Sequence, residues 1–157
     1  MEKRAMDMDE TSEITLKLTV LGARGSVPVS GGAFQKYGGA TSCFRVSVTD
    51  GEKNPLLPGV ILDGGSGIAL AGAEGEETVI LLSHLHLDHT IGLPFYQGLS
   101  KKEHRTTIYV PYGIEGETDG IAALRRTFSP PYWPLGLEDL PGDVRIEPFP
   151  DAAPLTL

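Results

Sequence analysis

The residues best suited to chemistry lie in SHLHLDHTIGLP, positions 83–94, which contains three of the four histidines of the chain. A His-x-His pair, His84 and His86, is followed by Asp88 and His89. Imidazole and carboxylate are ligands that favour zinc, iron or manganese. In an extended segment residues i, i+2 and i+4 point to one side, so His84, His86 and Asp88 would converge, while His89 re-enters from the next turn. The spacing predicts one ion at the His-x-His pair and allows a second at Asp88 and His89.

The same residues have a structural alternative, in which they are solvated loop residues and Asp88 is the N-cap of a helix. That alternative would suit a single histidine. Four such residues within six positions, directly after an apolar run, favour a metal site instead.

Two apolar runs lead into this chemistry and would position it. GVILD ends at Asp63, just before GGSG, and ETVILLS ends just before His84. A continuous apolar run such as ETVILLS is typical of a strand buried on both faces. Ligands are usually held at the carboxyl ends of strands in layered α/β folds. We therefore expect these two strand ends to be neighbours.

Strand-like and helix-like segments alternate along the rest of the chain. Further strands are expected at residues 14–24, 42–48, 106–110 and 143–149, and helices within 88–102 and at 120–128. The first of these strands has the pattern of a strand that enters a core. The glycine-rich residues 25–42 are too long for a hairpin turn, so they are either functional or poorly ordered. The alternation predicts the α/β or mixed α+β class.

Length and composition limit the function classes. A chain of 157 residues suits one domain, and it has no apolar run near the ~20 residues that cross a bilayer. The charged start, residues 1–13, lacks a secretory signal and is expected to be a disordered tail. The single Cys43 cannot form an internal disulfide, which agrees with a cytoplasmic location. A net charge of −8 makes nucleic acid an unlikely partner.

At this point the chain resembles a known family. HLHLDH matches the His-x-His-x-Asp-His signature of the metallo-β-lactamase fold, and LGARGSVPV, YGGATSC, ILDGGSG and FSPPYWPL resemble segments of its phosphodiesterase and RNase Z-like branch. The resemblance covers residues 16 to 150. One difference is Ala40, which stands where that branch often has asparagine.

The resemblance implies an αβ/βα sandwich, of which residues 14–157 are the amino-terminal half of a truncated domain. It implies a metal-dependent hydrolase, phosphodiesterase-like, that uses a metal-activated water and two zinc ions, with manganese or iron as alternatives. His84 and His86 would bind the first metal and Asp88 and His89 the second. Asp88 would be catalytic by positioning the water, and Asp63 would be an outer carboxylate that borders the site.

The same resemblance places the remaining ligands in a second half, after Leu157. We therefore expect little hydrolysis from this chain alone, and a partner that is either a second copy or the missing carboxy-terminal half. The substrate would be a small phosphorylated or ester compound. Two alternatives stay open: a non-catalytic metal-binding or interaction module, and a hydrolase of thioesters or lactones.

Lesser features each allow two interpretations. Arg24, with Gly25 and Ser26, borders an anionic substrate or, as we prefer, Arg24 caps a turn or pairs with a surface acid. His104, within KKEHR, is expected to be exposed on a basic surface. Tyr132 and Trp133 line a substrate mouth or anchor a proline-rich loop. The remaining cations form a phosphate-attracting patch or a solvated face: Lys101, Lys102, Arg105, Arg125 and Arg126.

Overall fold

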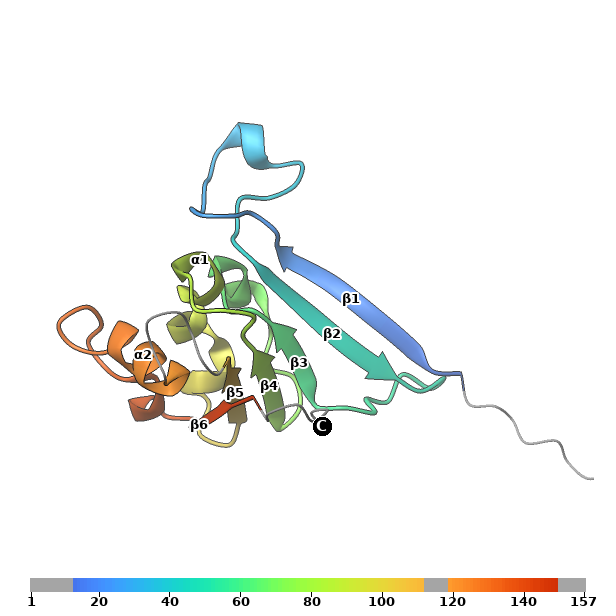
Figure 1. The fold of residues 1–157 in the computed structure, drawn as a ribbon. Coiled ribbons are helices and arrows are strands. Elements are labelled where there is room, and N and C mark those ends of the chain that lie inside the picture. Colours follow the sequence, from blue (N-terminus) through green and yellow to red (C-terminus); the bar gives the residue numbers. More distant parts are fainter. Residues whose placement is uncertain (1–12, 112–118, 150–157) are drawn as a thin grey trace, which may run out of the picture.

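The structure, a computed structural model, describes residues 13–111 and 119–149. Six strands form one sheet whose order follows the chain, so each strand lies beside its neighbours in sequence (Figure 1). The strands are β1 (Thr15–Gly22), β2 (Cys43–Thr49), β3 (Gly59–Leu62), β4 (Glu77–Leu81), β5 (Arg105–Val110) and β6 (Asp143–Pro148). β1, β2 and β3 pair antiparallel, whereas β3 to β6 pair parallel. The mixed α and β class and all six expected strands are confirmed.

The helical elements are short. They are α1 (Leu87–Thr90), α2 (Gly120–Thr127) and the 3-10 turns η1 (Gly32–Phe34), η2 (Ser66–Leu70), η3 (Leu93–Phe95), η4 (Gln97–Ser100) and η5 (Leu137–Asp139). The helix expected at residues 120–128 is confirmed, and Asp119 caps it by accepting from the N–H groups of Ile121 and Ala122. The single helix expected within residues 88–102 is wrong. Pro94 lies in the first turn of η3 instead, and Tyr96 is extended between η3 and η4.

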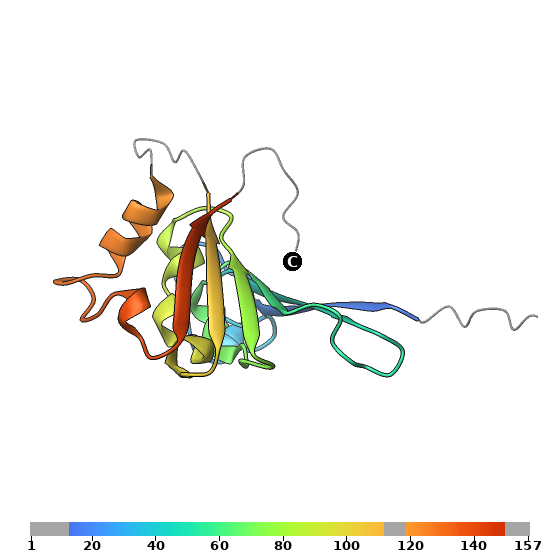
Figure 2. The ribbon, with the colours of Figure 1, turned by 90° about the horizontal axis from the view of Figure 1, so that it is seen from below.

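The core lies on one face of the parallel strands. Strand register aligns Ile61, Ile80, Ile108 and Ile146 across β3 to β6, and none is more than 7% exposed. Helices and turns lie on one side of the parallel strands, as Figure 2 shows. The covering side chains are Ile68, Leu93, Leu99, Leu124 and Leu137. Each fully buried apolar side chain of this size contributes ~1.5–3 kcal/mol.

The hairpin of β1 and β2 differs from this arrangement. Leu16, Leu18 and Val20 lie on one face of β1 and pair with apolar residues of β2, yet they are 70%, 56% and 59% exposed. The expectation that this strand enters a core is therefore wrong for most of β1. The reason is its position, because the hairpin extends beyond the helices (Figure 1).

The structure tests the expectations for the tail and for membrane spans only within the described residues. Apart from Glu13, the tail expected at residues 1–13 lies outside the described residues. Among the described residues, the helices are all too short or too polar to cross a bilayer.

Candidate metal centre

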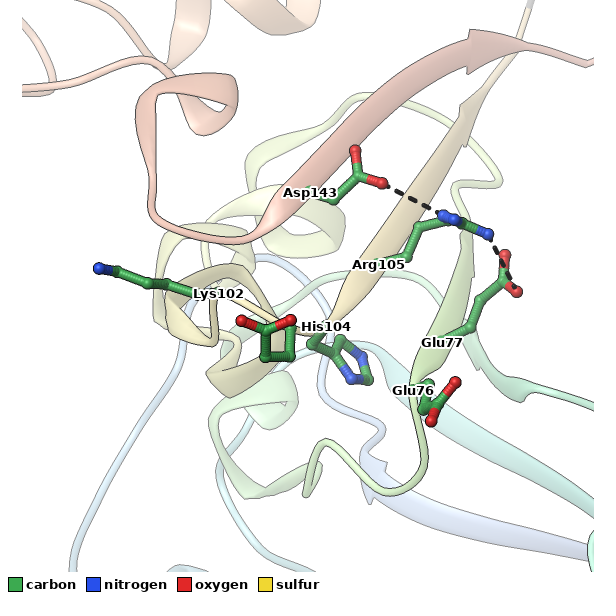
Figure 3. Close-up of a pocket in the computed structure, with 7 residues that line it drawn as sticks. Glu76, Glu77, Lys102, His104, Arg105 and Asp143 are labelled. Atoms are coloured by element: carbon green, nitrogen blue, oxygen red, sulfur yellow. Dashed lines mark hydrogen bonds and ion pairs between the residues drawn. The ribbon is translucent and has the colours of Figure 1, made fainter.

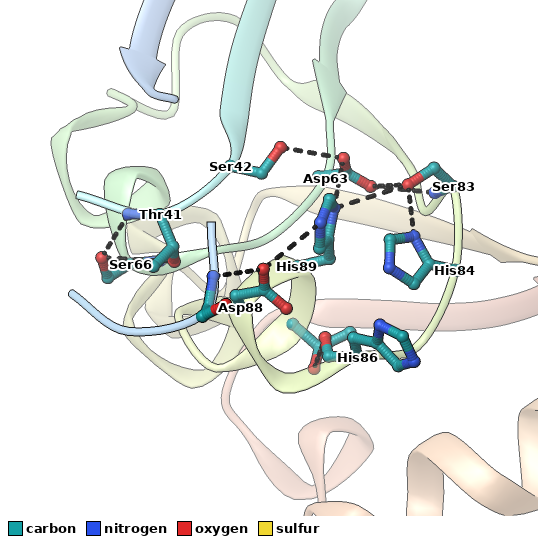
Figure 4. Close-up of polar contacts among 11 residues, drawn as sticks. Thr41, Ser42, Asp63, Ser66, Ser83, His84, His86, Asp88 and His89 are labelled. Carbon is teal, nitrogen blue, oxygen red and sulfur yellow. Dashed lines mark hydrogen bonds and ion pairs between the residues drawn. The ribbon is translucent and has the colours of Figure 1, made fainter. Parts of the chain in front are cut away.

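Two strand ends meet at the centre of the polar cluster in Figure 4. β3 and β4 are parallel neighbours, so Asp63 and Ser83 follow them at the same edge of the sheet. Asp63 Oδ1 accepts hydrogen bonds from the N–H of Ser83 at 2.9 Å and from its Oγ at 2.8 Å. The expected neighbourhood of the two strand ends is confirmed.

Asp63 also controls the ring of His89. His89 Nδ1 donates to Asp63 Oδ2 at 2.7 Å, and the hydroxyl of Ser42 donates to the same oxygen at 3.1 Å. Burial raises the pKa of Asp63, but the hydrogen bonds from Ser83 and His89 outweigh burial and hold that pKa below its usual value. An ionised carboxylate only accepts hydrogen bonds, so Nδ1 carries the proton. In the neutral ring, Nε2 of His89 keeps a lone pair for a metal.

The same reasoning fixes the tautomer of His84. The hydroxyl of Ser83 has one proton, which it donates to Asp63, so its oxygen accepts from Nδ1 of His84 at 3.0 Å. Nε2 of His84 is then the atom with a lone pair. Burial, followed by the electrostatic influence of the neighbouring His89 and His86 rings, lowers the pKa of His84 and favours its neutral form. Asp63 thus prepares two imidazoles as ligands, one directly and one through Ser83.

Asp88 lies on α1 rather than on an extended segment. The N-cap of α1 is His86, so the alternative that Asp88 caps the helix is wrong. Asp88 Oδ2 accepts instead from the N–H of Ser26 at 2.8 Å. This hydrogen bond, above all, lowers the pKa of Asp88 and keeps the carboxylate ionised. Ser26 belongs to the glycine-rich residues 25–42, so that segment reaches the cluster.

The imidazole rings lie close together. The ring centroid of His84 is 4.6 Å from that of His86 and 4.0 Å from that of His89. Nε2 of His89 is 3.6 Å from Oδ2 of Asp88. Two ligand atoms on one tetrahedral zinc lie about 3.4 Å apart, so this last pair has nearly the separation that a shared ion requires.

Close backbone packing holds the cluster to the sheet. The N–H of Gly64 donates to the carbonyl of His89 at 2.6 Å, and the N–H of Gly65 donates to the carbonyl of Ser42 at 2.9 Å. A Cβ at Gly65 would collide with the carbonyls of Ser42 and Asp88. The segment after β3 therefore needs glycine, because only a residue without a side chain lets three backbone segments meet there.

The donors fit a divalent ion in type, but they do not yet form a complete ligand shell. Within residues 13–111 and 119–149, no group of three or more His, Cys, Asp or Glu side chains is arranged to hold an ion. The arrangement offers two ligand pairs: His84 with His86, and Asp88 with His89. Metal binding at this centre would require these side chains to move from the positions that the structure describes.

Sequence reasoning missed that three serines make hydrogen bonds to the carboxylates of the cluster: Ser26, Ser42 and Ser83. A signal was available for Ser83, because it directly precedes His84 at the end of the apolar run. Ser26 and Ser42 lie at the two ends of the glycine-rich residues 25–42. Their position in a segment of possible function was the signal there. Serine is common in loops, so its type alone does not separate these positions from others.

The expectation that His104 is exposed is wrong. Its side chain is 2% exposed, with Nδ1 donating to the carbonyl of Gly75 at 3.2 Å. Nε2 then accepts from the hydroxyl of Thr78 at 3.0 Å, and Thr78 lies 2.7 Å from the hydroxyl of Tyr96. His104 is therefore a buried histidine whose two ring nitrogens are both hydrogen-bonded, and it contributes no ligand to the metal cluster.

Two of the cations considered in the sequence, Arg105 and Arg125, form ion pairs with acidic side chains. Figure 3 shows a pocket of about 270 Å³ in which Arg105 lies between Asp143, at 3.2 Å, and Glu77, at 3.9 Å. On α2, Arg125 forms a two-pronged pair with Glu138 at 2.7 Å. Both Arg105 and Arg125 are therefore paired with acids, which counts against their part in a phosphate-attracting patch.

Arg24 and Trp133 have structural roles, in a turn and in anchoring the proline-rich loop, whereas Tyr132 does not. Arg24 Nε donates to the carbonyl of Val27 at 3.0 Å, so Arg24 holds a turn, as preferred. Trp133 packs edge-to-face on Phe95 and Phe128, with centroid distances of 5.5 and 6.1 Å, and so anchors the loop. Tyr132 is 82% exposed and does not.

No protein-family model, curated protein or solved structure matches this chain. The resemblance to the metallo-β-lactamase fold therefore rests on the sequence motifs alone.

Proposed function

We propose that this chain carries part of the active centre of a metal-dependent hydrolase of phosphodiesterase type, and that its fold corresponds to the amino-terminal half of a metallo-β-lactamase sandwich. The observation that supports the proposal most is the control of two histidine tautomers by one carboxylate. Asp63 orients His89 directly and His84 through Ser83. Metal-binding histidines commonly have such a carboxylate partner, which raises their basicity and fixes the ring.

The residues would divide between two ions. His84 and His86 would hold the first, and Asp88 and His89 the second. A bound pair of divalent ions supplies Lewis acidity and an activated water at neutral pH. Asp88 stays ionised through the N–H of Ser26 and would orient the attacking water by accepting its hydrogen bond. The proposed substrate is a small phosphorylated or ester compound, and the proposed location is the cytoplasm.

Each ion would have only two ligands from this chain, so we expect weak metal affinity and little turnover without a partner. The proposed partner is either a second copy or a carboxy-terminal half that provides the remaining ligands. Poor hydrolysis of bis(p-nitrophenyl) phosphate by the chain alone, with added zinc or manganese, is the expected result. Turnover at about 1 per second or more that Asp88→Ala abolishes would contradict the expected incompleteness.

Titration calorimetry with zinc tests the proposal. We expect the double variant His84→Ala, His86→Ala to lose at least about tenfold in affinity, because it lacks one ligand pair. Glu52→Ala, which removes an exposed acid from the turn between β2 and β3, is the matched control and should bind as the wild type does. Equal zinc binding by wild type and double variant would refute the metal centre.

The pH dependence gives a second check. Binding should weaken as pH falls below about 6, because an imidazole must be neutral to bind a metal. The lowered pKa of His84 keeps that ring neutral further into acid than a free histidine. Affinity that stays constant from pH 7.5 to 5 would exclude imidazole ligands.

The arrangement of donors also gives one reason to keep the non-catalytic alternative. No complete ligand group occurs among the described residues, which is what an interaction module without catalysis would also show. Adding the proposed partner separates the two, because only the hydrolase gains turnover. A panel of thioesters and lactones beside the phosphodiester identifies the substrate class.

A further inference from the structure

A second pocket adjoins the metal cluster. It has a volume of about 550 Å³, within the range of about 300–1,000 Å³ that small-molecule sites occupy. It lies between α1 and the end of α2 with its following loop. Most of its lining is apolar or aromatic: Leu87, Ile91, Phe128, Tyr132 and Trp133, with Arg126 and Thr127.

The pocket and the cluster share α1. Leu87 and Ile91 are four residues apart, so they lie on the same side of the helix and form one wall of the pocket. Asp88 follows Leu87 and is rotated from it by about 100° around the helix axis. Leu87 and Ile91 of the pocket therefore flank Asp88 and His89 of the cluster within one turn of helix.

The aromatic wall is fixed in place while its surface stays accessible. Trp133 is held edge-to-face by Phe95 and Phe128, so its ring orientation does not have to be ordered on binding. Tyr132 and Leu87 are 82% and 58% exposed. Exposed apolar side chains beside a polar cluster favour a ligand that has both an apolar group and a charged group.

We propose that this pocket binds an aromatic group of a phosphodiester whose phosphate lies at the metal cluster; this inference rests on the proposed hydrolase function. The planar group packs against Trp133 and Tyr132, with Leu87 and Ile91 beneath it. The pocket thereby selects aryl esters over alkyl esters of similar charge.

Trp133 gives a direct readout, because it is the only tryptophan of the chain. Its emission is followed while diphenyl phosphate, dimethyl phosphate or phenol is added, with and without zinc. We expect diphenyl phosphate and phenol to change the emission to saturation and dimethyl phosphate to leave it unchanged. Zinc should tighten the binding of diphenyl phosphate and not that of phenol.

Two variants locate the site. Tyr132→Ser and Ile91→Ser should each weaken diphenyl phosphate binding by about tenfold, the effect of losing one apolar contact face. Leu70→Ser is the matched control, because Leu70 is an apolar residue of η2 that is 71% exposed and does not line the pocket. Thermal unfolding of each variant confirms that it is folded.

The outcomes separate this inference from the hydrolase proposal. Phenol and diphenyl phosphate that bind with a zinc-independent affinity support the pocket and count against the metal centre. Zinc-dependent binding of dimethyl phosphate as tight as that of diphenyl phosphate supports the metal centre and overturns the aromatic pocket. An emission change that Leu70→Ser weakens as much as Tyr132→Ser also overturns it.

Discussion

The hairpin of β1 and β2 and the parallel strands β3 to β6 belong to one sheet, but they bury their apolar side chains to very different extents. Ile80, in the centre of the parallel strands, is 0% exposed, whereas Leu18, in the centre of β1, is 56% exposed. Both residues lie in apolar strand patterns. An apolar pattern thus identifies which face of a strand needs cover, but not whether the same chain supplies that cover.

The polar cluster lies at the ends of the parallel strands, whose apolar side chains are buried. Asp63 and Ser83 lie at the ends of β3 and β4, whose buried rows hold them in place. The hairpin contributes mainly through the loop that it carries, where Ser26 reaches Asp88. Rigid support and an exposed apolar surface are therefore separated within one sheet.

The largest expected effect is on stability in the two regions. Ile80→Ala should reduce the free energy of unfolding by ~3–4 kcal/mol, because it leaves a cavity in the isoleucine row. Leu18→Ala, on the exposed face of β1, should cost less than ~1 kcal/mol. Urea unfolding of both variants measures the difference. Equal losses would show that the hairpin face is covered in solution.

A second prediction concerns the junction between the two regions. Gly65→Ala should reduce the free energy of unfolding by ~1–3 kcal/mol, because the added methyl group meets the carbonyls of Ser42 and Asp88. Gly25→Ala is the control, since a Cβ at Gly25 has no atom within 4 Å. Thermal unfolding compares them. A Gly65→Ala protein as stable as the control would mean that the three backbone segments do not meet as described.

The exposed face of β1 should also cause association. We expect the chain to self-associate at micromolar concentrations, because apolar β1 residues remain exposed on an edge strand. Leu18→Lys should weaken association by about tenfold. Thr15→Lys adds the same charge at an odd-numbered position of β1, on the opposite face, and is its control. Light scattering after size exclusion measures both, and a wild-type monomer at high micromolar concentration would contradict the expectation.

The smallest effect concerns the covering layer of the parallel strands. The hydrogen bonds from Arg125 lower the pKa of Glu138, so the pair stabilises the fold above the unfolded pKa of about 4.3 and loses that contribution as pH falls through the lowered folded value. Both side chains are partly exposed, so Glu138→Gln should cost about 0.5 kcal/mol at pH 7. The difference from wild type should vanish near pH 3. A difference that persists there would assign the effect to packing.

Local patterns were enough to predict the strands and the residues of the cluster. The runs GVILD and ETVILLS gave both the buried strands and the adjacent ends that carry Asp63 and His84, because parallel neighbours end at one edge. Periodicity was also enough for α2. In each case the decisive information lies within about ten residues of sequence.

Contacts between distant residues could not be predicted in this way. Ser26 and Asp88, which are 62 residues apart, form the hydrogen bond that joins the glycine-rich segment to the cluster. His104 is buried by partners at Gly75 and Thr78, whereas its own neighbours in KKEHR are charged. Local sequence reports the character of a segment, but burial and hydrogen bonding depend on what the fold brings to it.

The order of the strands has a consequence for how the chain folds during synthesis. Because the sheet order repeats the chain order, each strand pairs only with strands made just before or after it. A ribosome adds about 5–20 residues per second, whereas strand pairing takes microseconds to milliseconds, so each strand has time to join the existing edge before the next one emerges. No strand has to be inserted between two earlier ones. The sheet can grow in the direction of translation, with Ile146 the last of the four isoleucines to join the row.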